Sequence, residues 1–171
     1  MSELASRLAD DEGSAWAELY DMTIDAMFAY VTVVVGNRET AADVVQEAFL
    51  RLHRSRDRLR GVEDLNAFVF TVVRNEANRS LARNRKHASN GELAEPPIDE
   101  FSHSHDDDLE LIHHALTMLS VDERELIQMK IFGQMTFSQI AAVLELPIGT
   151  CTSRYRRSLE KMRVFLQEQI G

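Results

Sequence analysis

A segment near the carboxyl end of the chain combines hydroxyl and guanidinium groups at the start of a predicted helix. Its members are Thr150, Thr152, Ser153, Arg154 and Arg157. Arginine can pair bidentately with guanine in the major groove, and hydroxyls can bond to phosphates or base edges. The chemistry that this combination favours is recognition of duplex DNA. The alternative is an ordinary helical hairpin whose basic face is only solvated.

Two predicted helices position these side chains. Thr136 and Gln139 form a capping box that opens the first helix, residues 145–147 supply a turn, and the second helix runs to about Gln167. Two helices joined by a turn of three or four residues are typical of a helix-turn-helix motif. Cys151 is expected to face the small core of this motif as a buried thiol, and redox sensing is the alternative.

A second concentration of nucleic-acid chemistry lies in residues 51–86, which carry ten Lys or Arg and four acidic residues. Its basic residues flank a polar loop at 60–64: Arg54, Arg56, Arg58 and Arg60 precede Gly61, and Arg74, Arg79, Arg83, Arg85 and Lys86 follow, interspersed with Asn75 and Asn78. An arginine-rich helix beside a polar loop can hold the phosphates and separated bases of a single strand. Phe68 and Phe70 could stack on such bases. The helical spacing of Phe68, however, favours a position in the core.

A third pattern is a polar and acidic stripe in the first half of the chain. Asp43, Gln46, Glu47 and Leu50 follow one another at three- and four-residue steps, which places them on one face of a helix. Together with Phe49, this face could dock on a helix of a partner protein. The alternative is an outer face that is only solvated.

Charge is unevenly distributed along the 171 residues, whose net charge is −9. Residues 1–50 carry two Arg and ten acidic residues, and residues 87–112 carry eight acidic residues and no Lys or Arg. The basic block at 51–86 therefore lies between two acidic ones. Because local basic surface sets the electrostatic footprint on DNA, the negative net charge does not exclude a nucleic-acid partner.

Composition and periodicity predict an all-α protein. Hydrophobic residues make up 44% of the chain, and only seven Gly and three Pro are present, which favours helices. Apolar residues recur at helical spacing over 16–34 and 65–85. Another helix is expected to open near Thr40, with Asp43 as the partner in a short capping-box variant.

Residues 88–111 lack this periodicity and are rich in polar residues, Pro and His, as expected of a flexible linker. Behind them, Ser120 and Glu123 form a capping box for a further helix. We therefore expect two small helical domains, residues 1–87 and 112–171, joined by an acidic linker.

Other kinds of site have weaker support. The single cysteine excludes a disulfide framework and a zinc site with paired cysteines. His103, His105, His113 and His114 lie near Asp106–Asp108, but in a linker such groups are more often solvated than bound to a metal. Since no catalytic triad, phosphate loop or nucleotide fingerprint is present, we expect no catalytic residue, metal or cofactor. No apolar run could span a bilayer and no signal peptide is present, which predicts a cytoplasmic protein without membrane insertion.

Four segments, in order and with the linker between the second and third, resemble sigma factors of the extracytoplasmic-function type. The segments TAADVVQEAFLRL at 40–52 and NAFVFTVVRN at 66–75 resemble sigma region two. The segments LSVDEREL at 119–126 and IAAVLELPIGTCTSR at 140–154 resemble sigma region four. With their spacing and the linker, they cover most of the chain.

The resemblance implies a role for each group of residues. Asp43, Gln46, Glu47 and Leu50 correspond to the surface that binds the clamp helices of core RNA polymerase. The residues that correspond to the minus-ten site, where a flipped base of the melted strand is held, are Arg58, Arg60, Asp64, Asn66, Arg74, Asn75 and Arg83. Thr150, Thr152, Ser153, Arg154 and Arg157 correspond to the reader of the minus-35 duplex. The resemblance also implies an anti-sigma factor as a partner.

Several positions depart from the pattern of that family. Phe68 stands where the family usually has Trp, Arg79 where it often has Asp, and Ala82 where it often has Arg. Glu145 replaces the glycine of the helix-turn-helix turn, so this turn must avoid a left-handed backbone or accept strain. The Cys-Thr pair at 151–152 replaces a commoner Val-Lys pair and removes one phosphate contact.

We expect a non-enzymatic sigma factor that binds core polymerase, reads two promoter elements and stabilises the melted strand. The acidic first half and linker are expected to discourage DNA binding until polymerase holds the domains apart. One alternative is a helix-turn-helix regulator that acts without polymerase, but it explains only residues 136–157 and would usually need a dimerisation element. The other is a helical module that sequesters a partner protein and binds no DNA.

Overall fold

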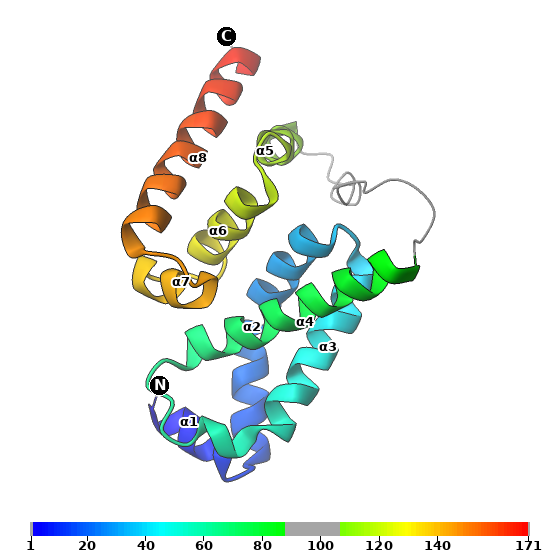
Figure 1. Ribbon diagram of the computed structural model, residues 1–171, viewed down its shortest axis with the longest axis vertical. Coiled ribbons are helices and arrows are strands. Elements are labelled where there is room, and N and C mark those ends of the chain that lie inside the picture. Colours follow the sequence, from blue (N-terminus) through cyan, green and yellow to red (C-terminus); the bar gives the residue numbers. More distant parts are fainter. Residues whose placement is uncertain (1, 88–106, 171) are drawn as a thin grey trace.

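The computed structural model describes residues 2–87 and 107–170, which form eight α-helices and one 3-10 helix and contain no strand (Figure 1). The helices of the first half are α1 (Ser2–Ala9), α2 (Gly13–Val35), α3 (Arg38–Arg54), the 3-10 helix η1 (Arg56–Leu59) and α4 (Leu65–His87). Those of the second half are α5 (Asp107–Thr117), α6 (Val121–Ile131), α7 (Phe137–Leu144) and α8 (Ile148–Ile170). The expectation of an all-α fold is confirmed.

The first half packs α2, α3 and α4 against one another, with α1 and η1 closing one end. The side chains of Tyr30, Leu52 and Val69 are fully buried where these helices meet. Burial of such large apolar groups is the main source of stability for a helical domain. The polar loop at 60–64 therefore connects elements that pack into this core.

The start of α3 differs from its expected position. The helix begins at Arg38, two residues before Thr40, because Asn37 acts as its N-cap and accepts a hydrogen bond from the Thr40 amide at 2.8 Å. Gly36, with φ of 74°, ends α2 directly before this cap, in the left-handed conformation that favours glycine at the end of a helix. Helix α1 was not expected at all, since its inward face consists only of Leu4, Ala5, Leu8 and Ala9.

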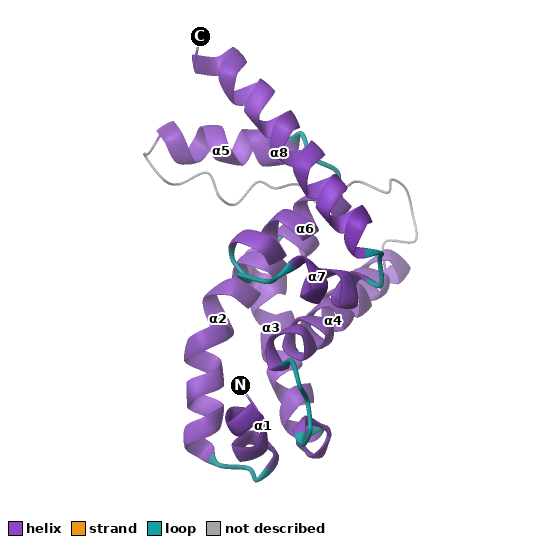
Figure 2. Cartoon of the chain, turned by 90° about the vertical axis from the view of Figure 1, so that its left-hand side faces the viewer, coloured by secondary structure: helices purple, strands orange, loops and turns teal. Residues whose placement is uncertain are grey.

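The second half contains the predicted helix-turn-helix, formed by α7, a short turn and α8 (Figure 2). Two of the predicted capping boxes are confirmed, Ser120 with Glu123 at α6 and Thr136 with Gln139 at α7. The variant predicted at Thr40 with Asp43 is wrong, because Asn37 is the N-cap of α3. Glu145 ends α7 in a left-handed conformation with φ of 56° and ψ of 42°. The turn therefore accepts the left-handed backbone that a glycine would take more readily.

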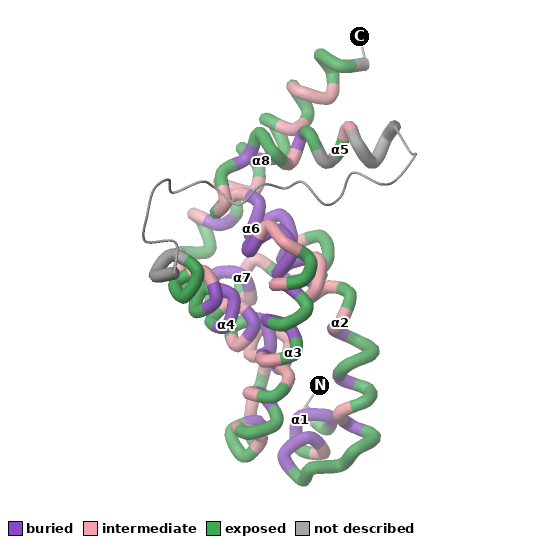
Figure 3. The backbone as a smooth tube through the Cα atoms, turned by 90° about the vertical axis from the view of Figure 1, so that its right-hand side faces the viewer, coloured by how far each residue is buried: buried purple, intermediate pink, exposed green. Residues whose placement is uncertain are grey.

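The two halves pack on each other rather than standing apart. Helix α6 lies against α2, and α7 lies against α4, so buried residues of both halves join one core (Figure 3). Residues 88–106 of the predicted linker lie outside the described residues. Residues 107–111 of that linker belong to α5. The interface between the halves is the feature that most affects the candidate site.

Candidate nucleic-acid interface

The first turns of α8 carry the hydroxyl groups that the sequence singled out. Thr152 is exposed, and its hydroxyl donates a hydrogen bond to the carbonyl of Ile148 at 3.0 Å. The Ser153 hydroxyl donates to the carbonyl of Thr150 at 3.1 Å. These local bonds use the hydroxyl protons and leave oxygen lone pairs available to accept bonds.

Two arginines of α8 point to different surroundings. Arg154 reaches α6, where its Nη1 lies 3.3 Å from Asp122 Oδ2, and its side chain is only 24% exposed. Arg156 is exposed, and its side chain has no hydrogen bond or ion pair with any described residue. Because it follows Thr152 by four residues, it continues the same outward face of the helix. Arg156 was not among the residues expected to contact DNA, although its spacing from Thr152 places it on the same face.

Gly149 opens this outward face in the first turn of α8. A side-chain carbon placed on Gly149 would meet nothing within 4 Å, so packing within the chain does not require a glycine here. Glycine also favours a helix less than alanine does. A residue of this kind suits a place where another backbone, such as a DNA phosphate strand, approaches closely.

Cys151 lies on the opposite side of α8 and is completely buried. Burial raises the pKa of its thiol, although the charge of Arg154 acts in the other direction. A thiol with a raised pKa is less reactive, because the thiolate is the reactive form. The expected structural role of Cys151 therefore agrees with its position.

The residues expected at the minus-ten site are divided by the structure into two groups. Arg58, Asn75 and Arg83 are exposed, and their side chains make no hydrogen bond or ion pair within the described ranges. Asn75, Arg79 and Arg83 follow one another at four-residue steps, so they form one stripe along α4. Arg79 in this stripe also bonds to the buried Glu76, with Nη1 and Oε1 2.7 Å apart.

The other expected minus-ten residues already have partners. Arg60 pairs with Asp10 near the end of α1 at 2.5 Å, between exposed side chains. The other three bond to the second half of the chain. Asp64 accepts a hydrogen bond from Gln139, Asn66 donates to the carbonyl of Gly133, and Arg74 donates to Glu125. In this arrangement the second half of the chain binds three of the seven expected residues.

The guanidinium of Arg74 is held by an acidic residue of the second half. Its Nε lies 2.8 Å from Glu125 Oε1. Partial burial acts to lower the pKa of Arg74, but the hydrogen bond and charge of Glu125 outweigh it, with smaller contributions from Tyr30 and Glu145. The net result is a raised pKa, so Arg74 stays charged.

The acidic turn after α1 contacts the basic segment before the loop at 60–64. Asp11 Oδ1 lies 2.9 Å from His53 Nε2, and Asp11 Oδ2 lies 3.6 Å from Arg56 Nε. Asp11 has φ of 61°, which is uncommon for a residue other than glycine. All three side chains are substantially exposed, so each pair contributes little to stability.

The expected protein-binding stripe lies on α3. Asp43, Gln46 and Leu50 are exposed, and Glu47 is half-buried with its carboxylate 3.5 Å from Arg54. Beside the stripe runs a groove of about 730 Å³ between α2 and α3. Its apolar lining includes Trp16, Tyr20, Ile24, Phe28, Phe49 and Leu50. A polar stripe beside an open apolar groove is a surface that suits docking of a helix.

Metal and membrane sites find no support in the described part of the chain. There, no three His, Cys, Asp or Glu residues gather in a way that could hold a metal ion. His103, His105 and the side chain of His113 lie outside what the structure describes. Among the described helices, none is long and apolar enough to cross a bilayer.

Comparisons with known families match the two halves separately. Residues 19–87 match the model of Sigma-70 region 2, and residues 109–162 match that of Sigma-70 region 4. Together these matches cover more than half of the chain and include α3, α4, α7 and the first turns of α8.

Individual relatives agree with these matches. The chain is 29% identical over 168 residues to the ECF RNA polymerase sigma factor SigL of Mycobacterium tuberculosis strain H37Rv, covering 95% of each chain. It is 26% identical over 132 residues to the ECF RNA polymerase sigma-E factor of Escherichia coli K12, covering 69% of each.

Two solved structures share the fold. One is CnrH in complex with the cytosolic domain of CnrY, with a TM-score of 0.72, 20% identity and coverage of 98% and 97% of the two chains. The other is the sigma factor RpoE with the anti-sigma factor NepR from Bartonella quintana, with a TM-score of 0.70, 24% identity and coverage of 88% and 96%. The family models and these relatives show that the chain belongs to the sigma-70 family, as a sigma factor of the extracytoplasmic-function type.

Proposed function

We propose that this sigma factor uses three separate surfaces to start transcription at particular promoters. The α3 stripe with its neighbouring groove binds core RNA polymerase. The outward face of α8 reads the minus-35 duplex, and α4 with the loop before it holds the melted minus-ten strand. The functional units are residues 1–87 and 112–171, and the protein itself performs no catalysis.

The observation that carries this proposal is the outward face of α8 in a helix-turn-helix. Gly149, Thr152 and Arg156 lie on it at three- and four-residue steps, and the two side chains are exposed. Arginine on such a face can read guanine, and a glycine allows close approach to the DNA backbone. We assign base reading to Arg156 beside Thr152, Ser153 and Arg157, and we assign Arg154 the task of orienting α8 on α6.

The surface on α3 supports the polymerase-binding part of the proposal. Leu50 and Tyr20 expose 44% and 48% of their surfaces at the groove between α2 and α3. Large apolar groups exposed together, with a polar rim, mark sites of protein interaction. Asp43 and Gln46 provide polar contacts at the edge of this groove.

Two further expectations belong to this proposal. Both similar solved structures are complexes, one with an anti-sigma factor and one with the cytosolic domain of CnrY, which supports control of this chain by an anti-sigma partner. Since a sigma factor acts with RNA polymerase on chromosomal DNA, the proposal also places the protein in the cytoplasm.

Run-off transcription on a library of promoter fragments tests the proposal. Core polymerase should initiate at a defined subset of fragments only when this chain is added. The aligned start sites would then give the two promoter elements. If the chain neither binds core polymerase nor changes initiation, the proposal is wrong, and DNA binding by the chain alone would favour a simple helix-turn-helix regulator.

A further inference from the structure

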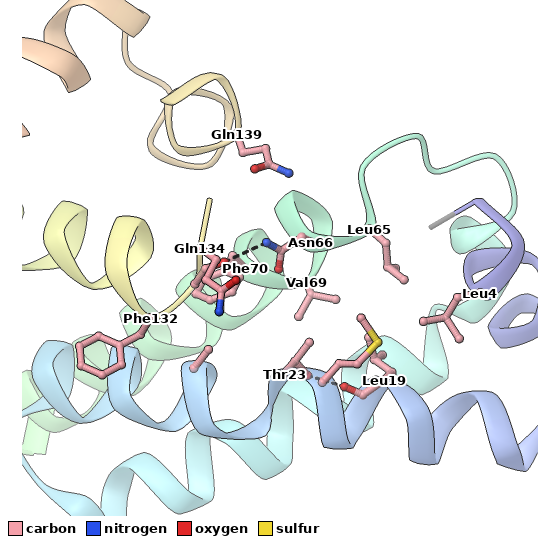
Figure 4. A pocket seen from close by; sticks show the side chains of 13 residues that line it. Leu4, Leu19, Thr23, Leu65, Asn66, Val69, Phe70, Phe132, Gln134 and Gln139 are labelled. Atoms are coloured by element: carbon pink, nitrogen blue, oxygen red, sulfur yellow. Dashed lines mark hydrogen bonds between the residues drawn. The ribbon is translucent and has the colours of Figure 1, made fainter. Parts of the chain in front are cut away.

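The contact between the two halves falls on residues proposed for the minus-ten strand. The Asn66 side chain donates to the carbonyl of Gly133 at 3.1 Å, as Figure 4 shows. Gln139 donates to Asp64 at 3.0 Å. Arg74 donates to Glu125 at 2.8 Å. Three of the proposed strand contacts are therefore used within the chain, each by a group from the second half.

The most deeply buried of these contacts is centred on Glu125. The Tyr30 hydroxyl donates to Glu125 Oε1 at 2.5 Å, and Arg74 donates to the same oxygen. Tyr30 is fully buried, and the Glu125 side chain is 11% exposed. Burial, reinforced by the charge of Glu125, raises the pKa of Tyr30, so its hydroxyl remains protonated as a donor. Charge-assisted bonds of this kind are among the stronger hydrogen bonds in proteins.

The surfaces around this cluster are complementary in shape. A side-chain carbon on Gly133 would lie only 2.9 Å from Phe70 Cζ and 2.7 Å from the carbonyl oxygen of Met129. The turn after α6 can therefore lie directly on the Phe70 ring, which is 1% exposed. Phe70 in turn packs edge-on against Tyr30, with ring centroids 5.7 Å apart. The absence of a side chain at Gly133 permits this close approach.

This arrangement cannot read both promoter elements at once. Elements centred near −35 and −10 are about 25 base pairs apart, or about 85 Å along the duplex at 3.4 Å per base pair. Gln139, in the helix-turn-helix, is hydrogen bonded to Asp64 in the minus-ten loop. The two halves must therefore separate before both elements are bound, and separation breaks the Glu125 cluster.

We propose that Glu125 is an autoinhibitory latch within the chain: its carboxylate occupies Arg74 in place of a DNA phosphate and holds the free sigma factor closed without any partner protein. The inference rests on the proposed function for the meaning of Arg74, but the closed state can be measured without DNA. Polymerase would stabilise the open form by binding its separated halves.

Small-angle X-ray scattering of the full chain tests the latch directly. The free wild-type protein should scatter as one compact particle, with a radius of gyration near the value of about 16 Å for a folded chain of this length. Glu125→Gln keeps the shape of the side chain and removes its charge. Loss of a charge-assisted bond should shift the ratio of closed to open chains by roughly tenfold to a hundredfold, and the radius of gyration should rise.

Glu123→Gln is the matched control, because Glu123 lies on the same helix but pairs with Lys161 inside the second half. It should leave the radius of gyration unchanged. Tyr30→Phe removes one hydroxyl from the cluster and should open the chain in the same direction as Glu125→Gln, to a smaller extent. Circular dichroism verifies that each variant is folded, and if Glu125→Gln does not fold, Tyr30→Phe decides the question.

Binding to a short single-stranded DNA of randomised sequence gives the second readout. Glu125→Gln should bind it more tightly than wild type, whereas Glu123→Gln should not. The latch would be wrong if the free wild-type chain were already extended, or if the Glu125→Gln and Tyr30→Phe variants matched wild type in both measurements. Neither result would contradict the proposed function, which run-off transcription tests separately. Variants that open but never support initiation would instead contradict the proposed function.

Discussion

Arg154 Nη1 and Asp122 Oδ2 lie 3.3 Å apart and join the recognition helix α8 to α6. An arginine that the sequence places among the DNA readers therefore holds the helix in position from its inner side. Arg156 is exposed on the outer side of α8. We therefore expect substitutions of Arg154 and Arg156 to have different effects.

Arg156→Ala should lower initiation at the cognate promoter roughly tenfold to a hundredfold, because one good arginine contact to a base is worth about 1–3 kcal/mol. It should also relax the preference for one base pair of the minus-35 element. Arg154→Ala should reduce initiation less, keep the base preference and lower the melting temperature slightly. Run-off transcription on promoters substituted at each minus-35 position distinguishes the two, and equal loss of preference in both variants would contradict the assignment.

Gly149→Ala should separate folding from DNA binding. The added methyl group meets nothing within the chain, and alanine favours a helix more than glycine does, so stability should stay the same or rise. Initiation should fall if DNA approaches the backbone here. Gly13→Ala, at another uncrowded glycine, is the control and should leave initiation unchanged. Full promoter activity in Gly149→Ala would exclude close approach at this position.

Glu145→Gly should stabilise the protein. Glu145 occupies a left-handed conformation that costs a residue other than glycine about 1–2 kcal/mol. Removing part of this strain should raise the melting temperature by roughly 2–4 °C. Glu145→Ala retains the strain and should give no such gain, which separates the backbone effect from the loss of a carboxylate near Arg74. A lower melting temperature for Glu145→Gly would contradict this explanation.

Glu123 should make the stability of the protein depend on pH. Burial acts to raise the pKa of this carboxyl, but bonds from Lys161 and Ser120 outweigh it and hold the pKa below its ordinary value of 4.5. A lowered pKa in the folded state contributes stability that is present above 4.5 and is lost as pH falls through the lowered value. Glu123→Gln should therefore melt at a lower temperature than wild type at neutral pH, and the difference should shrink on acidification. A constant difference across pH would contradict this role.

Leu50→Ala should weaken binding to core polymerase with little change in folding, since Leu50 is exposed at the α2–α3 groove. Met22→Ala is a matched control, because Met22 is also an exposed apolar residue but lies away from that groove. Equilibrium binding to purified core polymerase should rank Leu50→Ala below wild type and Met22→Ala equal to it. Equal binding by all three proteins would contradict docking of core polymerase at the α2–α3 groove.

Local features of the fold could be predicted from the sequence. The capping boxes at Ser120 and Thr136 depend on residues three positions apart, and the end of α2 depends on Gly36 alone. Such signals act over one turn of helix and need no tertiary context. Helix α1 gave a weaker signal, because its two short apolar pairs acquire meaning only through packing on α2 and η1.

The candidate site was predictable in composition but not in arrangement. Which arginine of α8 faces outward depends on how Cys151 and Ser158 are buried, and this is decided by packing against other helices. The bond between Tyr30 and Glu125 joins residues 95 positions apart, so no local pattern could indicate it. The pairing of Asp64, Asn66 and Arg74 with the second half was missed for the same reason.

The central claim is that two distant surfaces of one chain must act together with core polymerase to start transcription. Run-off transcription with wild type, Leu50→Ala and Arg156→Ala at one promoter tests it most directly. Initiation should require the wild-type protein. A higher protein concentration should restore initiation with Leu50→Ala, but initiation with Arg156→Ala should stay low even when all core polymerase carries the variant. Initiation that is indifferent to both substitutions, or absent with wild type, would contradict the central claim.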